Sequence, residues 1–243
     1  MKAFWIYLGL AALTLAVFGL WPEIDLAAAR LFYLDGAFDG DELSDQILRE
    51  AFRAAPFVVL IVYGLLWAAR RAGRAPFWAP SGKAIIFLIM TMAIGPGLVV
   101  NLGLKDHWHR PRPYQTQQFH GPDPFRAWYQ TDGQCDRNCS FVSGEAATAF
   151  WLVAPASLLP PPVRAPAVIG AFAFGTAAGL LRMAFGGHYV SDVILGGLFT
   201  LIVIEAVRKT MWPRGMPPAD SGARRRPDGA RVASKPRAAQ RFS

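Results

Sequence analysis

The sequence predicts an all-α fold, an integral membrane bundle of six transmembrane helices. Hydrophobic residues make up 53% of the 243 residues, and the mean hydropathy is +0.26. Charged residues account for only 17%, whereas a soluble domain carries about 25%. Apolar segments recur between polar loops, and the longer ones are close to the ~20 residues that a helix needs to cross a bilayer.

The first apolar segment, residues 3–21, resembles a signal peptide. Its apolar run is longer than the ~7–15 residues of a signal-peptide core, and no convincing small-residue cleavage site follows. We therefore expect a retained first span, ended by Pro22 and Glu23. The other spans are predicted at residues 56–69, 84–104, 146–159, 165–181 and 190–207.

Three segments depart from this regular pattern. The third span contains Gly95-Pro96-Gly97, where a kink is expected. The fourth span is short unless it begins near Ser143. Residues 23–53, between the first two spans, are acidic but place apolar residues at helical spacing. This spacing predicts short amphipathic helices on the bilayer surface.

Positive charge is concentrated in residues 70–83 and after Arg208. Basic residues beside a span mark the cytoplasmic side. This bias predicts cytoplasmic termini, with the outer loops, residues 23–53 and 105–142, on the opposite face. The turn between the last two spans falls on that face too, so the polar motifs described below emerge on one side of the membrane.

Residues 210–243 contain mainly Pro, Gly, Ser, Ala and Arg. Such a segment buries too little apolar surface to offset its ordering entropy, so we expect a disordered basic cytoplasmic tail. The membrane domain is then residues 1–209. Beside a span, a basic tail contacts anionic lipid more often than nucleic acid, and no nucleic-acid partner is predicted.

The chain has two cysteines, Cys135 and Cys139. Two are too few for a disulfide framework, and no cysteine–histidine zinc pattern accompanies them. A local bridge between them is plausible if their loop faces an oxidising compartment. No metal or other cofactor is predicted.

Chemistry-bearing residues are concentrated between the last two spans. If a helix begins near His188, then His188 and Asp192 lie on one face, four residues apart. The carboxylate could accept a proton from one imidazole nitrogen and leave the other as a nucleophile. Arg182 offers a planar fork for phosphate oxygens. The alternative is an interface histidine with a capping aspartate.

Two upstream stretches could complete an anion site. Lys105 and Arg112 are two helical turns apart and could point into one pocket; equally, they could reach lipid headgroups. Ser143 is a good helix N-cap, and Gly144 allows a ligand close to the backbone. An anion could bind there, although a simple capped helix also explains the pair.

Together the three stretches resemble the type 2 phosphatidic acid phosphatase superfamily of membrane lipid phosphatases. That family carries the motifs Lys-x6-Arg-Pro, Pro-Ser-Gly-His and Ser-Arg-x5-His-x3-Asp. This chain has Lys105-x6-Arg112-Pro113, Val142-Ser143-Gly144-Glu145 and Leu181-Arg182-x5-His188-x3-Asp192. The order, the spacing and the position relative to the spans match over roughly residues 55–208.

The resemblance implies a metal-independent phosphatase mechanism. His188 would attack phosphorus and carry a transient phosphohistidine, with Asp192 orienting it. The phosphate oxygens would be held by Lys105, Arg112, Arg182, Ser143 and the Gly144 amide. Phosphoryl transfer depends mainly on such positioning and charge stabilisation.

Glu145 is the main departure, because the family has histidine there to protonate the leaving oxygen. A glutamate can do so only with a pKa raised towards the working pH. Three accounts remain open: Glu145 is such an acid, His107 or His109 replaces it, or the leaving group needs little protonation. Loss of activity is a fourth, against which the other motif residues argue.

We therefore expect a multi-pass enzyme of a bacterial inner membrane with its active site at the periplasmic end. It would hydrolyse the phosphomonoester or diphosphate of a membrane lipid; lipid A or undecaprenyl diphosphate is favoured, and phosphatidylglycerol phosphate or phosphatidate is possible. The alternatives are a lipid-to-lipid phosphotransferase of the same family and a non-catalytic phosphate-binding or transport protein. The oligomeric state is not predicted.

Overall fold

The computed structural model describes residues 2–38, 43–76, 78–105 and 107–214. Within them the chain is mostly helical, as predicted. The helices are α1 (Lys2–Leu20), α2 (Glu23–Arg30), α3 (Leu43–Arg71), α4 (Gly82–Met92), η1 (Ala93–Leu104), α5 (Gly144–Phe150), α6 (Val153–Ser157), α7 (Pro161–Ala184) and α8 (Val190–Met211). Two short turns, η2 (Pro113–Gln115) and η3 (Gln117–Phe119), and a two-stranded hairpin, β1 (Tyr33–Leu34) with β2 (Ala37–Phe38), complete it.

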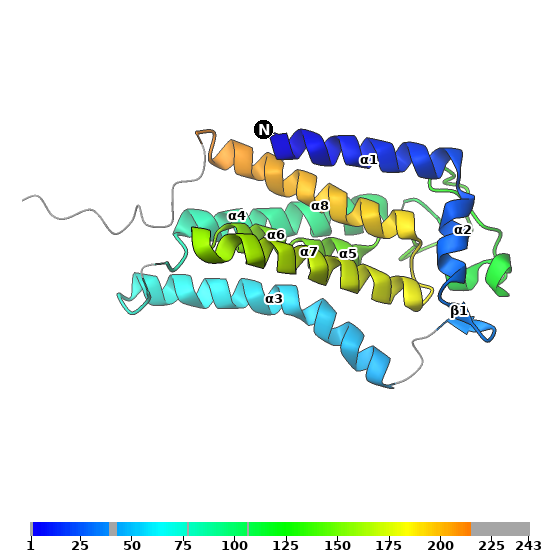
Figure 1. Ribbon diagram of the computed structural model, residues 1–243, viewed down its shortest axis with the longest axis horizontal. Helices are drawn as coiled ribbons and strands as arrows, with labels where there is room; N and C mark the ends of the chain where they lie inside the picture. Colours follow the sequence, from blue (N-terminus) through cyan, green and yellow to red (C-terminus); the bar gives the residue numbers. More distant parts are fainter. Residues whose placement is uncertain (1, 39–42, 77, 106, 215–243) are drawn as a thin grey trace, which may run out of the picture.

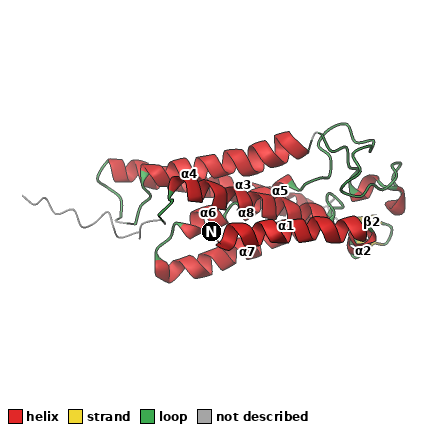
Figure 2. Ribbon diagram, turned by 90° about the horizontal axis from the view of Figure 1, so that it is seen from above, coloured by secondary structure: helices red, strands yellow, loops and turns green. Residues whose placement is uncertain are grey.

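The long helical segments α1, α3, α4 with η1, α7 and α8 run side by side (Figures 1 and 2). Among the described residues, these five are long and apolar enough to cross a membrane. Their outward side chains include large apolar residues such as Ile61, Leu102 and Ile169, each more than 60% exposed. Such faces suit a lipid environment, where apolar exposure has no cost.

The predicted fourth span forms two short helices, α5 and α6, in place of one long helix. Pro155 has no N–H to donate to the carbonyl of Trp151, which instead accepts from Ala154 at 2.8 Å. The pair packs inside the bundle, with α5 against α3, α7 and α8. Trp151 is fully buried and donates from Nε1 to Thr91 at 2.9 Å. This segment is therefore a central element of the bundle.

The expectation for residues 23–53 is only partly correct. Helix α2 and the hairpin are short surface elements, but α3 begins at Leu43 and runs continuously into the predicted second span. The helix contains Pro56 and bends in its middle (Figure 1), as an interior proline is expected to cause. At Gly95-Pro96-Gly97, where a kink is expected, the structure has a π-helix, because α4 continues into η1 just before these residues.

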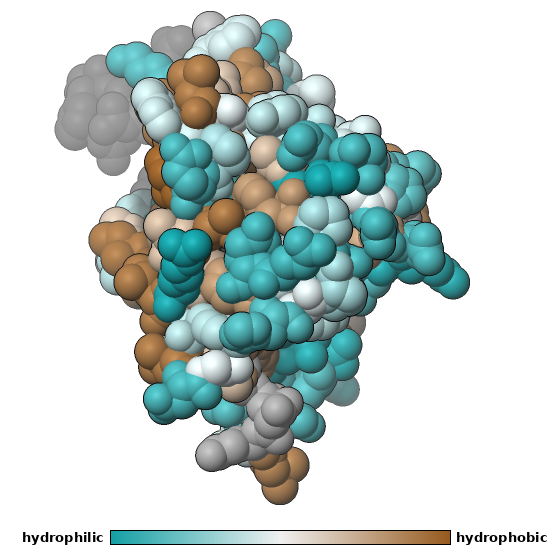
Figure 3. All heavy atoms as spheres, turned by 90° about the vertical axis from the view of Figure 1, so that its right-hand side faces the viewer, coloured by the Kyte–Doolittle hydropathy of each residue, from teal (hydrophilic) through white to brown (hydrophobic). Residues whose placement is uncertain are grey.

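One end of the bundle carries the polar structure. Helix α2, the hairpin, the loop from residue 107 to 143 and the turn between α7 and α8 all lie there (Figure 1), and hydrophilic side chains cover much of that end (Figure 3). Helix α8 packs closely against the end of this loop at Gly196. A Cβ atom at this position would lie only 2.7 Å from the carbonyl oxygen of Ser143, so the glycine allows the contact. The three sequence motifs are thereby gathered at one end.

Candidate active site

His188 lies in the turn before α8 and is 2% exposed. Its Nδ1 is 2.7 Å from the backbone carbonyl oxygen of Ser140. A carbonyl oxygen only accepts hydrogen bonds, so Nδ1 carries the proton and donates it. The lone pair is then on Nε2, the arrangement that a histidine nucleophile requires.

The direct hydrogen bond expected between Asp192 and His188 is not present. The Nδ1 to Oδ2 distance is 4.0 Å, because α8 begins at Val190 and His188 precedes the helix. Asp192 Oδ2 instead accepts from the Ser140 hydroxyl at 2.5 Å and from the Tyr189 amide at 3.0 Å. Ser140 therefore connects the two residues: its hydroxyl binds Asp192 and its carbonyl binds His188.

The other side of Asp192 is held by Arg110, which the sequence motifs do not assign. Arg110 is fully buried, and its Nη1 donates to Asp192 Oδ1 at 2.6 Å. Its Nη2 donates to Asp25 of α2 at 2.7 Å, and its guanidinium lies 4.3 Å from the centroid of the Tyr189 ring. Asp25 also accepts from the amide and hydroxyl of Ser191. A buried chain of charges thus connects α2 to the histidine.

Two pKa values in this cluster are shifted in the sense that catalysis needs. Burial lowers the pKa of His188 well below the usual 6.5, and the charges of Arg112, Arg182 and Lys105 lower it further. The imidazole is therefore neutral at neutral pH. Burial alone would lower the pKa of Arg110, but the carboxylates of Asp192 and Asp25 raise it above its usual value, so Arg110 stays charged.

The predicted cations lie around the same histidine. Arg112 is 9% exposed and donates to the Asn138 carbonyl from Nε at 3.1 Å and Nη2 at 2.7 Å; burial lowers its pKa. Arg182, at the end of α7, is 4% exposed. Its guanidinium packs against Gly187: a Cβ atom added to this glycine would lie 2.3 Å from Arg182 Nη2.

The second motif begins helix α5, as predicted. Ser143 is its N-cap, and its hydroxyl accepts from the Ala146 amide at 3.3 Å. A side chain on Gly144 would lie 2.5 Å from Asn101 Oδ1 and 3.5 Å from Lys105 Nζ. Lys105 and the second motif are therefore neighbours, and glycine makes this close approach possible.

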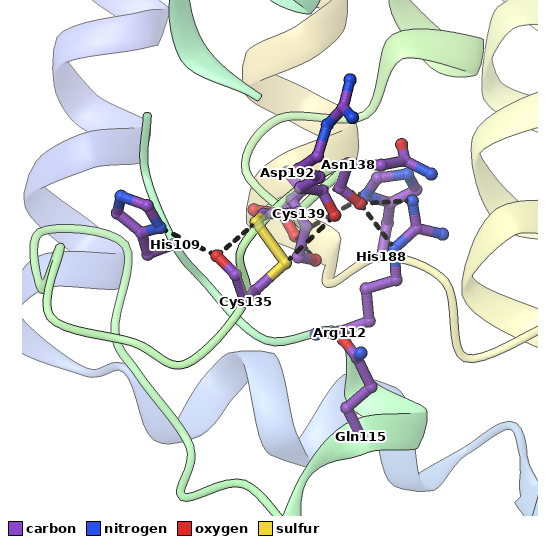
Figure 4. Close-up of a disulfide and its surroundings, with 10 residues drawn as sticks. His109, Arg112, Gln115, Cys135, Asn138, Cys139, His188 and Asp192 are labelled. Carbon is purple, nitrogen blue, oxygen red and sulfur yellow. Dashed lines mark hydrogen bonds and ion pairs between the residues drawn. A yellow bond between two sulfur atoms is a disulfide. The ribbon is translucent and has the colours of Figure 1, made fainter. Parts of the chain in front are cut away.

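Glu145 is paired with two guanidinium groups. Arg49 of α3 donates to it from Nη2 at 2.6 Å, and Arg182 Nε is 3.5 Å away. Opposite charges at this range favour the ionised carboxylate, which cannot donate a proton. Of the alternative acids, His109 donates from Nδ1 to the Cys135 carbonyl at 2.8 Å and lies across the disulfide from His188 (Figure 4); His107 is exposed.

The bridge between Cys135 and Cys139 is present (Figure 4). The loop that it closes carries Asn138, the acceptor for Arg112, and is followed directly by Ser140. The backbone on either side is fixed by hydrogen bonds from the Cys139 amide to Lys105 and from the Ser140 amide to Arg110. The disulfide therefore constrains the two carbonyl groups that orient Arg112 and His188.

Within the described ranges, no three His, Cys, Asp or Glu side chains are grouped as metal ligands. The site thus assembles a neutral histidine with its accepting nitrogen defined, a buried charge chain behind it, and cations from the first and third motifs, Lys105, Arg112 and Arg182, beside it. Sequence reasoning missed four contributors: Asp25, Arg49, Arg110 and Ser140. Only Arg110 had a signal, because Arg-Pro occurs twice, as Arg110-Pro111 and Arg112-Pro113.

Known proteins share sequence similarity with this chain. The PAP2 superfamily profile matches residues 82–216. The lipid A 4'-phosphatase of Rhizobium leguminosarum is 36% identical over 223 residues, which cover 85% of this chain and 94% of that protein. The lipid A 4'-phosphatase of Francisella tularensis subsp. novicida (strain U112) is 37% identical over 223 residues, 87% of this chain and 98% of that protein. No solved structure shows significant similarity.

Proposed function

Because the chain belongs to the PAP2 superfamily and is a membrane lipid phosphatase, we propose that its substrate is the 4'-phosphate of lipid A. The relatives that cover most of its length carry that activity in their names. Residues from the hairpin and from η3 also line the cavity beside Arg112 and Arg182, among them Tyr33, Phe38 and Phe119. This cavity of about 650 Å³ has room for a sugar headgroup.

The observation that carries the mechanism is the hydrogen bond from His188 Nδ1 to the Ser140 carbonyl. In the proposed reaction, Nε2 attacks phosphorus while the bond from phosphorus to the sugar oxygen breaks, giving a phosphohistidine and an alcohol. Water then attacks the phosphohistidine, which releases inorganic phosphate and restores neutral His188. Asp192 would act on His188 through Ser140, and a positioned imidazole of this kind lowers the entropic part of the barrier.

The cations would stabilise the charge that develops on the equatorial phosphate oxygens. The positive charge comes from Lys105, Arg112 and Arg182. The hydroxyl of Ser143 and the amide of Gly144 are the remaining proposed contacts to the phosphate. Glu145 is an unfavourable source for the leaving-group proton in the present arrangement, because it is ionised between Arg49 and Arg182. Cleavage of a 4'-phosphate expels a sugar alkoxide, which needs a proton, so of the other accounts we favour a histidine, His107 or His109, as the proton source.

We also propose a six-segment topology in a bacterial inner membrane, with α5 and α6 together as the fourth segment. The basic residues at the end of α3, Arg70 and Arg71, and at the end of α8, Arg208 and Lys209, lie away from the polar end. They support a cytoplasmic side there. The disulfide at the polar end supports an oxidising compartment around the site, so that the site faces the periplasm.

Phosphate release from purified protein in detergent tests this proposal. The substrates are lipid A, undecaprenyl diphosphate, phosphatidylglycerol phosphate and phosphatidate, each with and without a chelator. We expect release to be fastest from lipid A, to be unchanged by the chelator and to be abolished in His188→Ala. Equal release by His188→Ala and the parent protein would reject the phosphohistidine mechanism.

A further inference from the structure

Arg49 lies in the first turns of α3, outside the three sequence motifs. It donates to Glu145 Oε1 from Nη2 at 2.6 Å and from Nε at 3.1 Å. The two side chains are 36% and 20% exposed. The pair is partly open to solvent, and Arg182 Nε also lies 3.5 Å from Glu145, so the carboxylate keeps a cationic neighbour when Arg49 turns to another anion.

Arg49 also lines two cavities at once. The first, which we call the arginine cavity, is the 650 Å³ space lined by Arg112 and Arg182. Three guanidinium groups thus line it, and two of them, those of Arg112 and Arg182, also lower the pKa of the proposed nucleophile His188. Planar guanidinium forks match phosphate oxygens in pairs, and charge-assisted hydrogen bonds to phosphate are about twice as strong as neutral ones. The cavity is suited to a phosphate group.

The second cavity, which we call the α3 cavity, has a volume of about 600 Å³ and an apolar wall on α3. Phe57, Val58 and Ile61 form this wall and are about half exposed, at 49%, 54% and 61%. Lys105 and Glu145 lie at its other side. A cavity with an apolar wall facing the lipid region and cations at its head matches an amphiphile, with its chain along α3 and its phosphate beyond Arg49.

We propose that Arg49 is a substrate-binding residue: its guanidinium leaves Glu145 and holds a phosphate oxygen of the lipid together with Arg112 and Arg182. In the substrate-free protein, the ion pair with Glu145 keeps Arg49 beside the arginine cavity until the phosphate binds. This inference rests on the proposed function, since it takes a lipid phosphate as the ligand. It also gives a role to the glutamate that replaces the histidine of the resembled motif.

Binding can be measured without turnover in the His188→Ala protein, with fluorescent lipid A in detergent micelles as the probe and its 4'-dephosphorylated counterpart as the second probe. Arg49→Ala should weaken binding of the phosphorylated probe about tenfold or more, the loss expected for one hydrogen bond to a charged group. Binding of the dephosphorylated probe should change much less. Arg49→Lys should recover part of the affinity, because the charge returns without the planar fork.

Arg71→Ala is the matched control. It removes the same charge from the opposite end of the same helix, where the side chain is exposed. The double variant Arg49→Ala/Glu145→Gln separates two ways in which Arg49 could act. If Arg49 binds phosphate directly, affinity stays low in the double variant. If Arg49 only neutralises Glu145, the double variant regains the parent affinity, and the proposal is overturned.

The proposal is also overturned if Arg49→Ala binds both probes like its background protein, or if Arg71→Ala weakens binding equally. Failure of the proposed function has a different result. In that case the phosphorylated probe binds, and Arg49 still distinguishes the two probes, but the protein with His188 intact releases no phosphate. The binding measurement therefore tests the role of Arg49, and the turnover measurement tests the proposed function.

Discussion

The backbone carbonyl oxygen of Ser140 lies 2.7 Å from Nδ1 of His188, and the hydroxyl of the same serine lies 2.5 Å from Asp192. A single residue thus transmits the position of a buried carboxylate to the imidazole. The arrangement places the proton on Nδ1 without a carboxylate in direct contact. In place of the predicted direct contact between His188 and Asp192, the Ser140 carbonyl orients the imidazole and the Ser140 hydroxyl binds the carboxylate.

Ser140→Ala should therefore lower kcat more than it raises KM. The carbonyl group remains, but the hydroxyl contact to Asp192 is lost, and a hydrogen bond to a charged group is worth about 1.5–3 kcal/mol. We expect a fall in kcat of about 10- to 100-fold, at 1.4 kcal/mol per tenfold. Steady-state phosphate release measures it. Ser157→Ala, which removes a buried serine bound to Arg208, is the control, and an equal loss there would show a general packing effect.

The two arginines of the Arg-Pro repeat should behave differently. Arg110 is buried between Asp192 and Asp25, so Arg110→Ala leaves uncompensated buried charge, which costs about 3–5 kcal/mol of stability. Arg112→Ala should instead keep the fold and raise KM. Thermal unfolding in detergent, followed by tryptophan fluorescence, compares the two. Similar melting temperatures for both variants would contradict the structural role of Arg110.

Glu145→Gln tests the ion-paired carboxylate as an acid. Loss of a general acid lowers rates by about 10²–10⁴-fold. Arg182 lies 3.5 Å from Glu145 and favours the ionised carboxylate even when Arg49 has turned to the phosphate, so we expect kcat to fall by less than about tenfold. The measurement is kcat across a range of pH. A thousandfold loss together with disappearance of the basic limb of the pH profile would restore Glu145 to the acid role.

The pKa of His188 gives a prediction for pH dependence. Its folded value lies well below 6.5 because the ring is buried among cations, whereas the unfolded chain titrates near 6.5. Below that pH the unfolded chain binds more protons than the folded one. The stability that depends on neutral His188 is therefore fully present above about pH 6.5 and is lost as the pH falls through the lowered folded pKa.

NMR of histidine-labelled protein can follow this titration. The resonance missing from His188→Ala identifies the residue, and its shift should stay at the neutral position as the pH passes down through 6.5. A midpoint at or above 6.5 would mean that the imidazole is not desolvated as described. Arg112→Ala should move the midpoint upwards, because it removes one of the charges that lower the pKa.

The disulfide should matter for turnover. In the double variant Cys135→Ser/Cys139→Ser, the carbonyl groups of Asn138 and Ser140 lose a constraint close to His188. Misplacement of catalytic groups by about 1 Å can lower the reaction rate about 100-fold. We therefore expect kcat to fall, by up to about 100-fold. A reductant should cause the same loss in the parent protein and none in the double variant, since the chain has no other cysteine. An unchanged kcat in both would reject the role of the bridge.

Local spacing was enough to identify the motif residues but not their partners. Lys105, Arg112, Arg182 and His188 are recognisable because each stretch has a fixed pattern along the chain. The contacts of Arg110 with Asp25 and Asp192 join residues 85 and 82 positions apart, and no local pattern reports on them. Arg49 was likewise hidden in a segment that was predicted to lie on the bilayer surface.

The helix boundaries differ for similar reasons. Hydropathy located the five long apolar helical segments, but it carries no information on hydrogen bonding. The break between α5 and α6 depends on Pro155 and on the buried Trp151, which packing decides. Likewise the start of α8 at Val190 excluded the helical pairing expected for His188 and Asp192. A shift of two residues at one helix start changed the direct partner of the imidazole.

The disulfide between Cys135 and Cys139 determines when a newly synthesised molecule becomes catalytically active. On the proposed topology, its sulfur atoms remain reduced until the loop has been translocated and oxidised. We therefore expect nascent chains still facing the cytosol to lack a fully ordered nucleophile. Biosynthetic intermediates on that side would then be spared, and the enzyme would mature only where its finished substrate is displayed.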